Sequence, residues 1–311
     1  MRNLEYGSVD SLAGQSQFVQ ELKKISLVVC KNNACVLLKG EHGSGKRLFA
    51  SLVHLQGKNN PEDFFELNCR VYSAGEIEQF FSLVSQLPSF DFLTKTIFIS
   101  NVENLSGELQ EKLLVLIKNI REDRKNIRFI FSTEVNLEDK IEQGLFSGDL
   151  YYSMSSVPVN VLPLRQRKED IIPIAVYFFG KLKAVTGRGF EGFSEEAKDV
   201  MATYFWPGNI AELKNAVERA FIVGEPPFIK TSDLALRSGS NSGSEESAQG
   251  ILEAAQALED KTLKTAVNAF KKAYVTKVLE ENNWNQTKTA KILGIQRTYV
   301  IRLIDELQIR K

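Results

Sequence analysis

The residues that could do chemistry in this chain begin with a glycine-rich loop. In "LLKGEHGSGKR" an apolar run precedes Gly40, and the spacing Gly40-x-x-x-x-Gly45-Lys46 leads into the helix-forming "LFASLVHL". Glycines let backbone N–H groups converge on an anion at a helix N-terminus, while the lysine reaches the outer phosphates. The sequence therefore predicts a nucleotide-binding phosphate loop. Its predicted binding residues are Gly40, Glu41, His42, Gly43, Ser44, Gly45, Lys46 and Arg47.

The groups that would split a phosphate bond are missing. Arg47 follows the lysine, where the general pattern has a Ser or Thr that touches magnesium. A strand over "TKTIFISNVENL" ends at Ser100 and Asn101, where a carboxylate pair would hold magnesium and prime water, and neither side chain can serve as a base. Glu103 lies two residues further on and would serve only if a turn re-aimed it. We therefore predict no catalytic residue and no metal site; a loop that has lost nucleotide binding stays as the alternative.

The elements that must position this loop can be read from apolar runs. The runs "CVLLKG", "FFELNC", "TIFISN", "IRFIFST" and "VPVNVLPL" alternate with helix-period stretches, which is typical of a parallel sheet flanked by helices. After Pro163 the stretches "EDIIPIAVYFFGKLKAVTG", "SEEAKDVMATYF" and "NIAELKNAVERAFIV" indicate helices without intervening strands. The predicted domains are an α/β part over residues 1–163 and a helical part over residues 164–236.

The remaining residues form a separate basic module. The stretch "RSGSNSGSEESAQG", residues 237–250, has no large apolar residue and is predicted to be a flexible linker. The net charge of the whole chain is zero, but residues 264–311 hold ten Lys and Arg against four Asp and Glu, a net charge of +6. Residues 1–263 therefore carry −6. A basic module over residues 251–311 on an acidic body indicates a polyanion partner for the tail alone.

The tail contains the pattern of a helix-turn-helix. Asn285 can cap a helix over Gln286–Leu293, Gly294 supplies the turn, and a second helix runs from about Arg297 to Leu307. In such a motif the second helix enters the major groove of double-stranded DNA. The predicted DNA-binding residues are Lys288, Lys291, Gln296, Arg297, Thr298, Tyr299 and Arg302. The predicted packing residues between the helices are Ala290, Leu293, Ile295, Val300, Leu303 and Leu307.

Composition excludes several other classes of protein. Of the 311 residues 43% are hydrophobic and 25% are charged, which is ordinary for a globular protein of two or three domains. The longest apolar runs are far shorter than the roughly 18 residues of a membrane span, and Arg2 is not followed by the apolar stretch of a secretion signal. Cys30, Cys35 and Cys69 lack paired spacing, so we expect buried reduced thiols. The prediction is a cytoplasmic protein with no membrane partner.

The motifs, taken in order, resemble those of a known family. They are "AGQSQFVQELKKI", "GEHGSGKR", "FFELNC", "FSGDLYYSMSSVPVNVLPLRQRKEDI", "FWPGNIAELKNAVERA" and "NQTKTAKILGI". From Ser11 to Lys311 the chain resembles the NtrC-type bacterial enhancer-binding proteins, which are sigma-54 activators built from an AAA+ ATPase domain and a Fis-type helix-turn-helix. The resemblance implies an α/β P-loop AAA+ domain with a helical lid subdomain, followed by an all-α Fis-type helix-turn-helix domain.

The resemblance also shows where the chain departs from the family. The replaced positions are Ser100 and Asn101 for the Walker B Asp-Glu pair, Ser147 and Ser153 for the two arginine fingers, Glu134 for the sensor asparagine and Ala211 for the second-sensor arginine. An arginine finger is typically worth about 10³ to 10⁵ in rate, and a hydroxyl carries no charge to replace it. A glutamate at the sensor position puts negative charge where a γ-phosphate would lie. These losses imply a hydrolysis-defective, degenerate member.

The loop that grips sigma-54 is missing too. Between Cys69 and the strand at Thr96 the family carries an insertion with the GAFTGA loop, whereas this chain has only "RVYSAGEIEQFFSLVSQLPSFDFLTK". The chain is therefore not expected to remodel sigma-54 polymerase directly. An apolar stripe in residues 263–281 resembles the Fis-type dimer helix, which implies a homodimer with recognition helices about 34 Å apart and a larger AAA+ assembly as a further state.

The predicted function is that of a sequence-specific, DNA-binding transcription regulator. Its AAA+ domain would serve oligomerisation and hold ATP or ADP as a static ligand, with the need for Mg²⁺ left open. Three alternatives remain: a weakly active ATPase with substituted catalytic groups, a modulator that mixes with an active AAA+ relative, and a scaffold whose tail only dimerises.

Overall fold

The computed structural model describes most of the chain in two units. Residues 13–57, 59–88, 94–123 and 125–236 are described, and in the C-terminal region residues 272, 275, 276, 279, 284–293, 300–302 and 304. The contacts divide the chain into Met1–Leu236 and Arg237–Lys311. The predicted linker, residues 237–250, lies outside the described residues.

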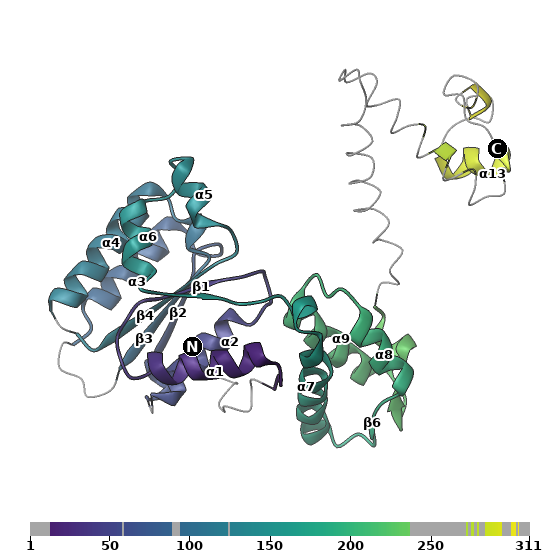
Figure 1. Cartoon of the computed structure of the whole chain (residues 1–311), viewed down its shortest axis with the longest axis horizontal. Coiled ribbons are helices and arrows are strands. Elements are labelled where there is room, and N and C mark those ends of the chain that lie inside the picture. Colours follow the sequence, from purple (N-terminus) through teal and green to yellow (C-terminus); the bar gives the residue numbers. More distant parts are fainter. Residues whose placement is uncertain are drawn as a thin grey trace. The chain divides into compact units, whose positions relative to one another are not determined.

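A five-stranded parallel sheet forms the centre of the first unit (Figure 1), as predicted. Its strand order is β2-β3-β4-β1-β5, so the phosphate-loop strand β1 lies between β4 and β5. The strands are β1 (Val36–Lys39), β2 (Phe64–Asn68), β3 (Lys95–Ser100), β4 (Ile127–Thr133) and β5 (Val157–Asn160). Because the strands are parallel, the residues that follow β1, β3 and β4 meet at the same edge of the sheet.

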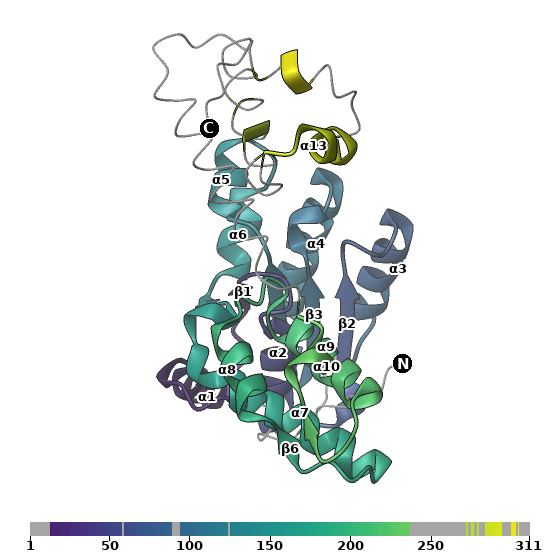
Figure 2. The same ribbon diagram turned by 90° about the vertical axis from the view of Figure 1, so that its right-hand side faces the viewer.

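Helices cover both faces of this sheet (Figures 1 and 2). The helices and short turns of this part are α1 (Gln17–Val29), α2 (Lys46–Gln56), η2 (Pro61–Asp63), α3 (Ala74–Ser85), η3 (Val102–Asn104), α4 (Gly107–Glu122), α5 (Leu137–Glu142) and α6 (Gly148–Met154). Several begin at a serine whose side chain accepts a backbone N–H of the first turn, as at Ser16, Ser106 and Ser147.

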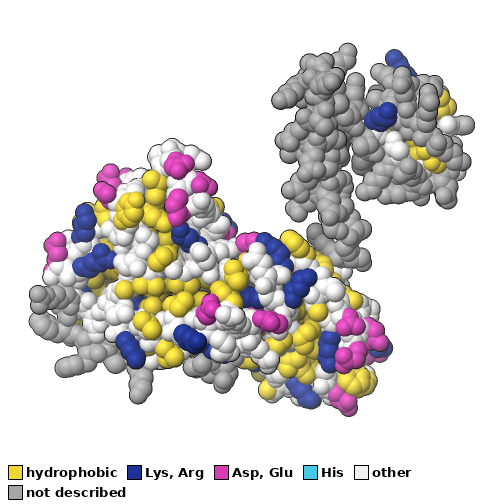
Figure 3. Space-filling view, in the orientation of Figure 1, with side chains coloured by type: hydrophobic (Ala, Val, Ile, Leu, Met, Phe, Trp, Pro, Cys, Tyr) yellow, Lys and Arg dark blue, Asp and Glu magenta, His cyan; other side chains and the backbone are white. Residues whose placement is uncertain are grey.

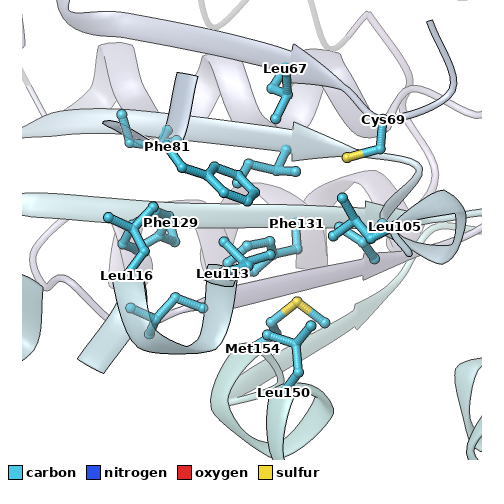
Figure 4. Close-up of a cluster of buried hydrophobic side chains, with 14 of the residues drawn as sticks. Leu67, Cys69, Phe81, Leu105, Leu113, Leu116, Phe129, Phe131, Leu150 and Met154 are labelled. Atoms are coloured by element: carbon cyan, nitrogen blue, oxygen red, sulfur yellow. The ribbon is translucent and has the colours of Figure 1, made fainter. Parts of the chain in front are cut away.

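Strand alternation sends side chains into two separate cores. Leu37, Ile99 and Phe131 belong to the core on the side of α3, α4 and α6. Figure 4 shows part of this core, with Phe131 beside Leu113 of α4 and Met154 of α6. The intervening Leu38 and Phe98 face the opposite side, where α1 and α2 pack. Complete burial of such a side chain stabilises the fold by roughly 1.5–3 kcal/mol. Both faces of β1, β3 and β4 are thus fixed, and with them the loops that follow.

A smaller domain follows the sheet within the same unit. Its elements are η4 (Leu164–Gln166), η5 (Lys168–Asp170), α7 (Ile171–Thr186), β6 (Gly192–Phe193), α8 (Glu195–Thr203), α9 (Asn209–Val223), β7 (Phe228–Ile229) and α10 (Thr231–Leu234). They enclose a core around the fully buried Trp206, whose indole N–H donates to the Met201 carbonyl at 2.8 Å. The predicted helices are present, but the expectation of no strands is wrong, since β6 and β7 pair in parallel.

The second unit contains the helix predicted beyond Asn285. Helix α13 runs over Gln286–Leu293, and the Asn285 side chain accepts the backbone N–H of Lys288 at 3.1 Å. Of the predicted packing residues, Ala290 and Val300 are buried, together with Val275 and Leu279. The remaining packing side chains lie outside the described residues, as does most of the predicted dimer helix over residues 263–281.

Two observations concern the helices and the surface. In the parts of the chain that are described, no helix combines the length and hydropathy of a membrane span. Acidic and basic side chains both lie on the face of the first unit seen in Figure 3.

All three cysteines are free; Cys35 and Cys69 are buried as predicted, whereas Cys30 is half-buried. Burial raises the pKa of the Cys69 thiol to about 12, so this thiol stays protonated.

Candidate nucleotide site

The predicted phosphate loop lies between β1 and α2. Gly45 caps α2 with a φ of 106°, a left-handed conformation that glycine adopts without strain. Lys46 begins the helix, and its ammonium group donates to the carbonyls of Gly40 and Glu41, each at 2.7 Å. The Lys46 side chain thus turns back onto the phosphate loop and is hydrogen-bonded to its backbone.

One atom of this loop is buried without a partner. The hydroxyl oxygen of Ser44 is enclosed but makes no hydrogen bond among the described residues. A buried hydroxyl without a partner costs free energy, and a phosphate oxygen is the acceptor that this type of loop normally receives. The orphaned hydroxyl, beside Lys46 and two glycines of positive φ, fits a nucleotide phosphate.

Arg47 is paired with β2. Its Nε and Nη2 atoms donate to the two carboxylate oxygens of Glu66 at 2.5 and 2.7 Å. The residue that follows the lysine is thus an arginine paired with Glu66 and not a magnesium-binding hydroxyl, and a cation does not ligate Mg²⁺. Within the described ranges no group of three or more His, Cys, Asp and Glu side chains could hold a metal ion.

The residues after β3 differ from the expectation in one respect, which is the position of the Glu103 carboxylate. The Ser100 hydroxyl donates to the Leu67 carbonyl at 3.3 Å, and Asn101 adopts a left-handed φ of 58° that starts the turn η3. This turn re-aims Glu103, whose Oε1 accepts the backbone N–H of Glu134 at 3.2 Å. The other carboxylate oxygen, Oε2, is buried without a partner. One carboxylate thus reaches the sheet edge, although two residues later than a Walker B pair.

A second carboxylate, that of Glu134, lies directly after β4. Its Oε1 atom is 2.9 Å from Nδ1 of His42 and 3.9 Å from Nζ of Lys46, and its Oε2 atom accepts Nη2 of Arg70 at 3.0 Å. Burial alone would raise the pKa of Glu134, but the hydrogen bond to His42 and the charges of Lys46 and Arg70 lower it overall. Burial lowers the pKa of Lys46, against the opposing charges of Glu134 and Glu103.

The turn at residues 206–209 and the start of α9, here called the lid turn, contact backbone carbonyls of the phosphate loop. The backbone N–H of Ile210 donates to the Gly43 carbonyl at 3.0 Å, and the Asn209 side-chain amide donates to the His42 carbonyl at 2.8 Å. A Cβ atom on Gly43 would lie 2.3 Å from the Gly208 carbonyl oxygen. Gly43 is therefore required both for its φ of 71° and for this close approach.

Two arginines in the segment between β5 and α7 also contact the phosphate loop. Arg165 makes a two-pronged ion pair with Glu41, which lowers the pKa of that carboxyl, and Asn209 donates to the same carboxylate at 3.2 Å. Arg167 is buried and donates to the Ser44 carbonyl at 2.6 Å. Sequence reasoning did not assign Arg165, Arg167 or Asn209 to the site. The runs "LPLRQRKEDI" and "WPGNIAEL" belong to the family resemblance, but the contacts that these residues make span more than 120 residues.

Of the two positions matched to arginine fingers, Ser147 uses its side chain within its own helix, and Ser153 makes a contact through its backbone. The Ser147 hydroxyl accepts the backbone N–H of Leu150 and so caps α6. The Ser153 carbonyl accepts Nη2 of Arg121 at 3.0 Å. Helix α3 runs without interruption from Ala74 to Ser85 in the segment where the resemblance implies that the GAFTGA insertion is absent.

The predicted DNA-binding residues are described only in part. Lys288 and Arg302 are exposed, and the Lys291 backbone belongs to α13. Gln296, Arg297, Thr298 and Tyr299 lie outside the described residues. The described members therefore present two cations of the second unit to solvent.

Three families match successive parts of the chain. Residues 13–164 match the sigma-54 interaction domain, residues 165–250 the AAA+ ATPase lid domain, and residues 268–304 the Fis family of bacterial regulatory proteins. The Nif-specific regulatory protein of Rhizobium leguminosarum bv. trifolii is 31% identical over 247 residues, which cover 73% of this chain and 70% of that protein. The chain belongs to the NtrC-type family of sigma-54 activators.

Two further members support this assignment. The response regulator protein PilR of Pseudomonas aeruginosa is 30% identical over 311 residues, covering 94% of this chain and 68% of PilR. A crystal structure of NtrX from Brucella abortus in complex with ADP superposes with a TM-score of 0.60 at 25% identity, covering 95% of this chain and 68% of that one. This NtrC-type chain spans 55% to 70% of the length of such curated relatives.

Proposed function

We propose that this NtrC-type protein is a sequence-specific, DNA-binding transcription regulator whose AAA+ unit binds nucleotide without hydrolysing it. The main support is the sheet edge after β3 and β4. There the Ser100 hydroxyl donates to the Leu67 carbonyl, the Asn101 side-chain amide donates to Glu103, and the Glu134 carboxylate lies 3.9 Å from the ammonium group of Lys46. Neither a serine nor an asparagine accepts a proton from water at neutral pH.

Nucleotide would act as a static ligand that joins the two parts of the first unit. Ser44 and Lys46 would hold its phosphates, and the lid already contacts the same loop through Asn209 and Ile210. A ligand that binds only the folded protein stabilises it in proportion to the logarithm of its concentration. NtrX, a member of the same fold, was crystallised with ADP. The AAA+ unit would use this ligand to support a homo-oligomer, while the Fis-type module contacts DNA.

Three measurements on the full chain test this function. Calorimetric titration should detect ADP binding to the wild type and none to Lys46→Ala, and steady-state phosphate release from ATP should equal that of Lys46→Ala. Robust turnover above this control would contradict the proposal. Fluorescence anisotropy with DNA recovered from random fragments should show a sequence preference, whereas a dimerisation scaffold would bind all duplexes alike or none.

A weakly active ATPase is the second candidate, and Glu103 favours it. Its unpartnered Oε2 atom is buried at the sheet edge, and its charge opposes the lowering of the Lys46 pKa that burial causes. If Glu103 primed water, phosphate release would exceed that of Lys46→Ala and would fall to that level in Glu103→Gln. Equal rates in all three proteins would remove this candidate.

A further inference from the structure

The carboxylate of Glu134 lies next to the phosphate loop, where side chains from three elements surround it. Three cationic or donor side chains surround it: His42 from the loop itself, Lys46 from the start of α2, and Arg70 from the segment after β2. Only 15% of the Glu134 side chain is exposed, and 9% of the Lys46 side chain. The arrangement is that of a bound anion whose ligands come from three separate elements.

The position of this carboxylate along the site follows from Lys46. In a phosphate loop the lysine reaches the outer phosphates, while the loop backbone cradles the inner ones. Glu134 lies 3.9 Å from the lysine Nζ atom, so its negative charge stands at the outer end of the site. The inner part of the site retains the orphaned Ser44 hydroxyl, which has no such internal partner.

A terminal phosphate would therefore meet a negative charge already paired with its own ligands. Bringing a further phosphate to within a few ångströms of a carboxylate is repulsive, and the repulsion is stronger in a partly buried site than in water. A diphosphate avoids this conflict because it leaves the outer end to Glu134.

We propose that Glu134 takes the place of the outermost phosphate, so that the site selects a nucleoside diphosphate over a nucleoside triphosphate. This inference rests on the proposed binding of nucleotide and names the class of ligand that the site takes. It assigns Glu134 as a specificity-determining residue, and His42 and Arg70 as the groups that hold its carboxylate in place.

Titration of the full chain with ADP and with ATP, each with Mg²⁺ and with EDTA, tests the preference without any mutation. We expect ADP to bind at least about tenfold more tightly than ATP, a difference of about 1.4 kcal/mol. Glu134→Gln keeps the size of the side chain and removes its charge. It should strengthen ATP binding by about tenfold or more and leave ADP binding within about twofold.

Glu138→Gln is the matched control, since it removes the same charge from a paired carboxylate four residues further on, whose partners are Lys39 and Tyr151. It should leave the ratio of ADP to ATP affinity unchanged. Equal affinities in the wild type, a preference for ATP, or a Glu134→Gln variant that strengthens both ligands alike would overturn the inference. If neither the wild type nor Glu134→Gln binds any nucleotide, the proposed nucleotide binding itself fails. If only Glu134→Gln binds, Glu134 blocks the site instead of selecting a diphosphate.

Discussion

Gly43 is the single residue on which the contact between loop and lid depends most directly. Its φ of 71° is left-handed, and a Cβ there would lie 2.3 Å from the Gly208 carbonyl oxygen. We expect Gly43→Ala to lower the free energy of unfolding by about 1–3 kcal/mol through backbone strain, with a further loss because the lid turn must move. Urea denaturation followed by circular dichroism measures this change.

Gly144→Ala separates the two causes of that loss. Gly144 has nearly the same φ, 70°, but nothing lies within 4 Å of the Cβ that alanine would add. Its substitution should therefore cost only the conformational strain of a left-handed alanine. An equal loss in both variants would show that the contact with Gly208 contributes nothing.

Glu138 contributes stability that depends on pH. Hydrogen bonds from Lys39 and Tyr151 lower its pKa from 4.5 to about 2. A carboxylate whose pKa is lower in the folded state stabilises the fold above its unfolded pKa, and this contribution disappears as pH falls toward the folded pKa. We expect Glu138→Gln to lower the urea midpoint at pH 7 and the gap from wild type to close between pH 4.5 and about 2.

The gap should be modest, because 44% of the Glu138 side chain is exposed and solvent screens the ion pair. Glu195→Gln is a suitable comparison, because Glu195 pairs with Lys198 but 82% of its side chain is exposed. It should shift the midpoint at pH 7 less than Glu138→Gln. A gap that stays constant down to pH 2 would argue against the role of the Glu138 carboxylate.

Among the elements, helix α9 joins the lid to the phosphate loop. Its first residue, Asn209, is fully buried, accepts the backbone N–H of Leu164 and donates to the His42 carbonyl. Asn209→Ala leaves these groups without partners and should cost about 1–3 kcal/mol of stability. Hydrogen exchange should then speed up at Leu164 and in the loop. Asn119→Ala, on the exposed side of α4, is the control, and equal destabilisation by both would contradict this role.

The elements also mark how far the sequence predicts this structure. Strands β1, β3 and β4 were found because their apolar runs are buried on both faces of a parallel sheet. Strands β6 and β7 were missed, since two residues each are too short to carry a period. The orientation of the Glu103 side chain toward the sheet edge was not predictable either. It depends on the left-handed backbone conformation of Asn101, which only the packed structure specifies. The contacts of Arg165 and Asn209 were missed because they join segments far apart in sequence.

For the whole molecule, the division of charge is the feature that bears on DNA. Residues 264–311 carry +6 and the rest of the chain −6. An acidic body repels DNA at low ionic strength, so attraction must come from the tail. Binding should therefore weaken steeply with salt, because each phosphate contact releases counterions. The slope of log affinity against log salt concentration counts these contacts.

Lys288 is a suitable residue for testing the number of phosphate contacts. It lies exposed on α13, whose start is fixed by the Asn285 cap. Lys288→Ala should weaken binding to all DNA sequences alike and reduce the salt slope by about 1, since a phosphate contact carries no base information. Lys272→Ala removes an exposed charge that lies outside the predicted helix-turn-helix, residues 285–307, and should leave the slope unchanged. Anisotropy titrations at several salt concentrations distinguish the two variants. Equal slopes for both would mean that the tail attracts DNA only through its net charge, and that α13 makes no defined phosphate contact through Lys288.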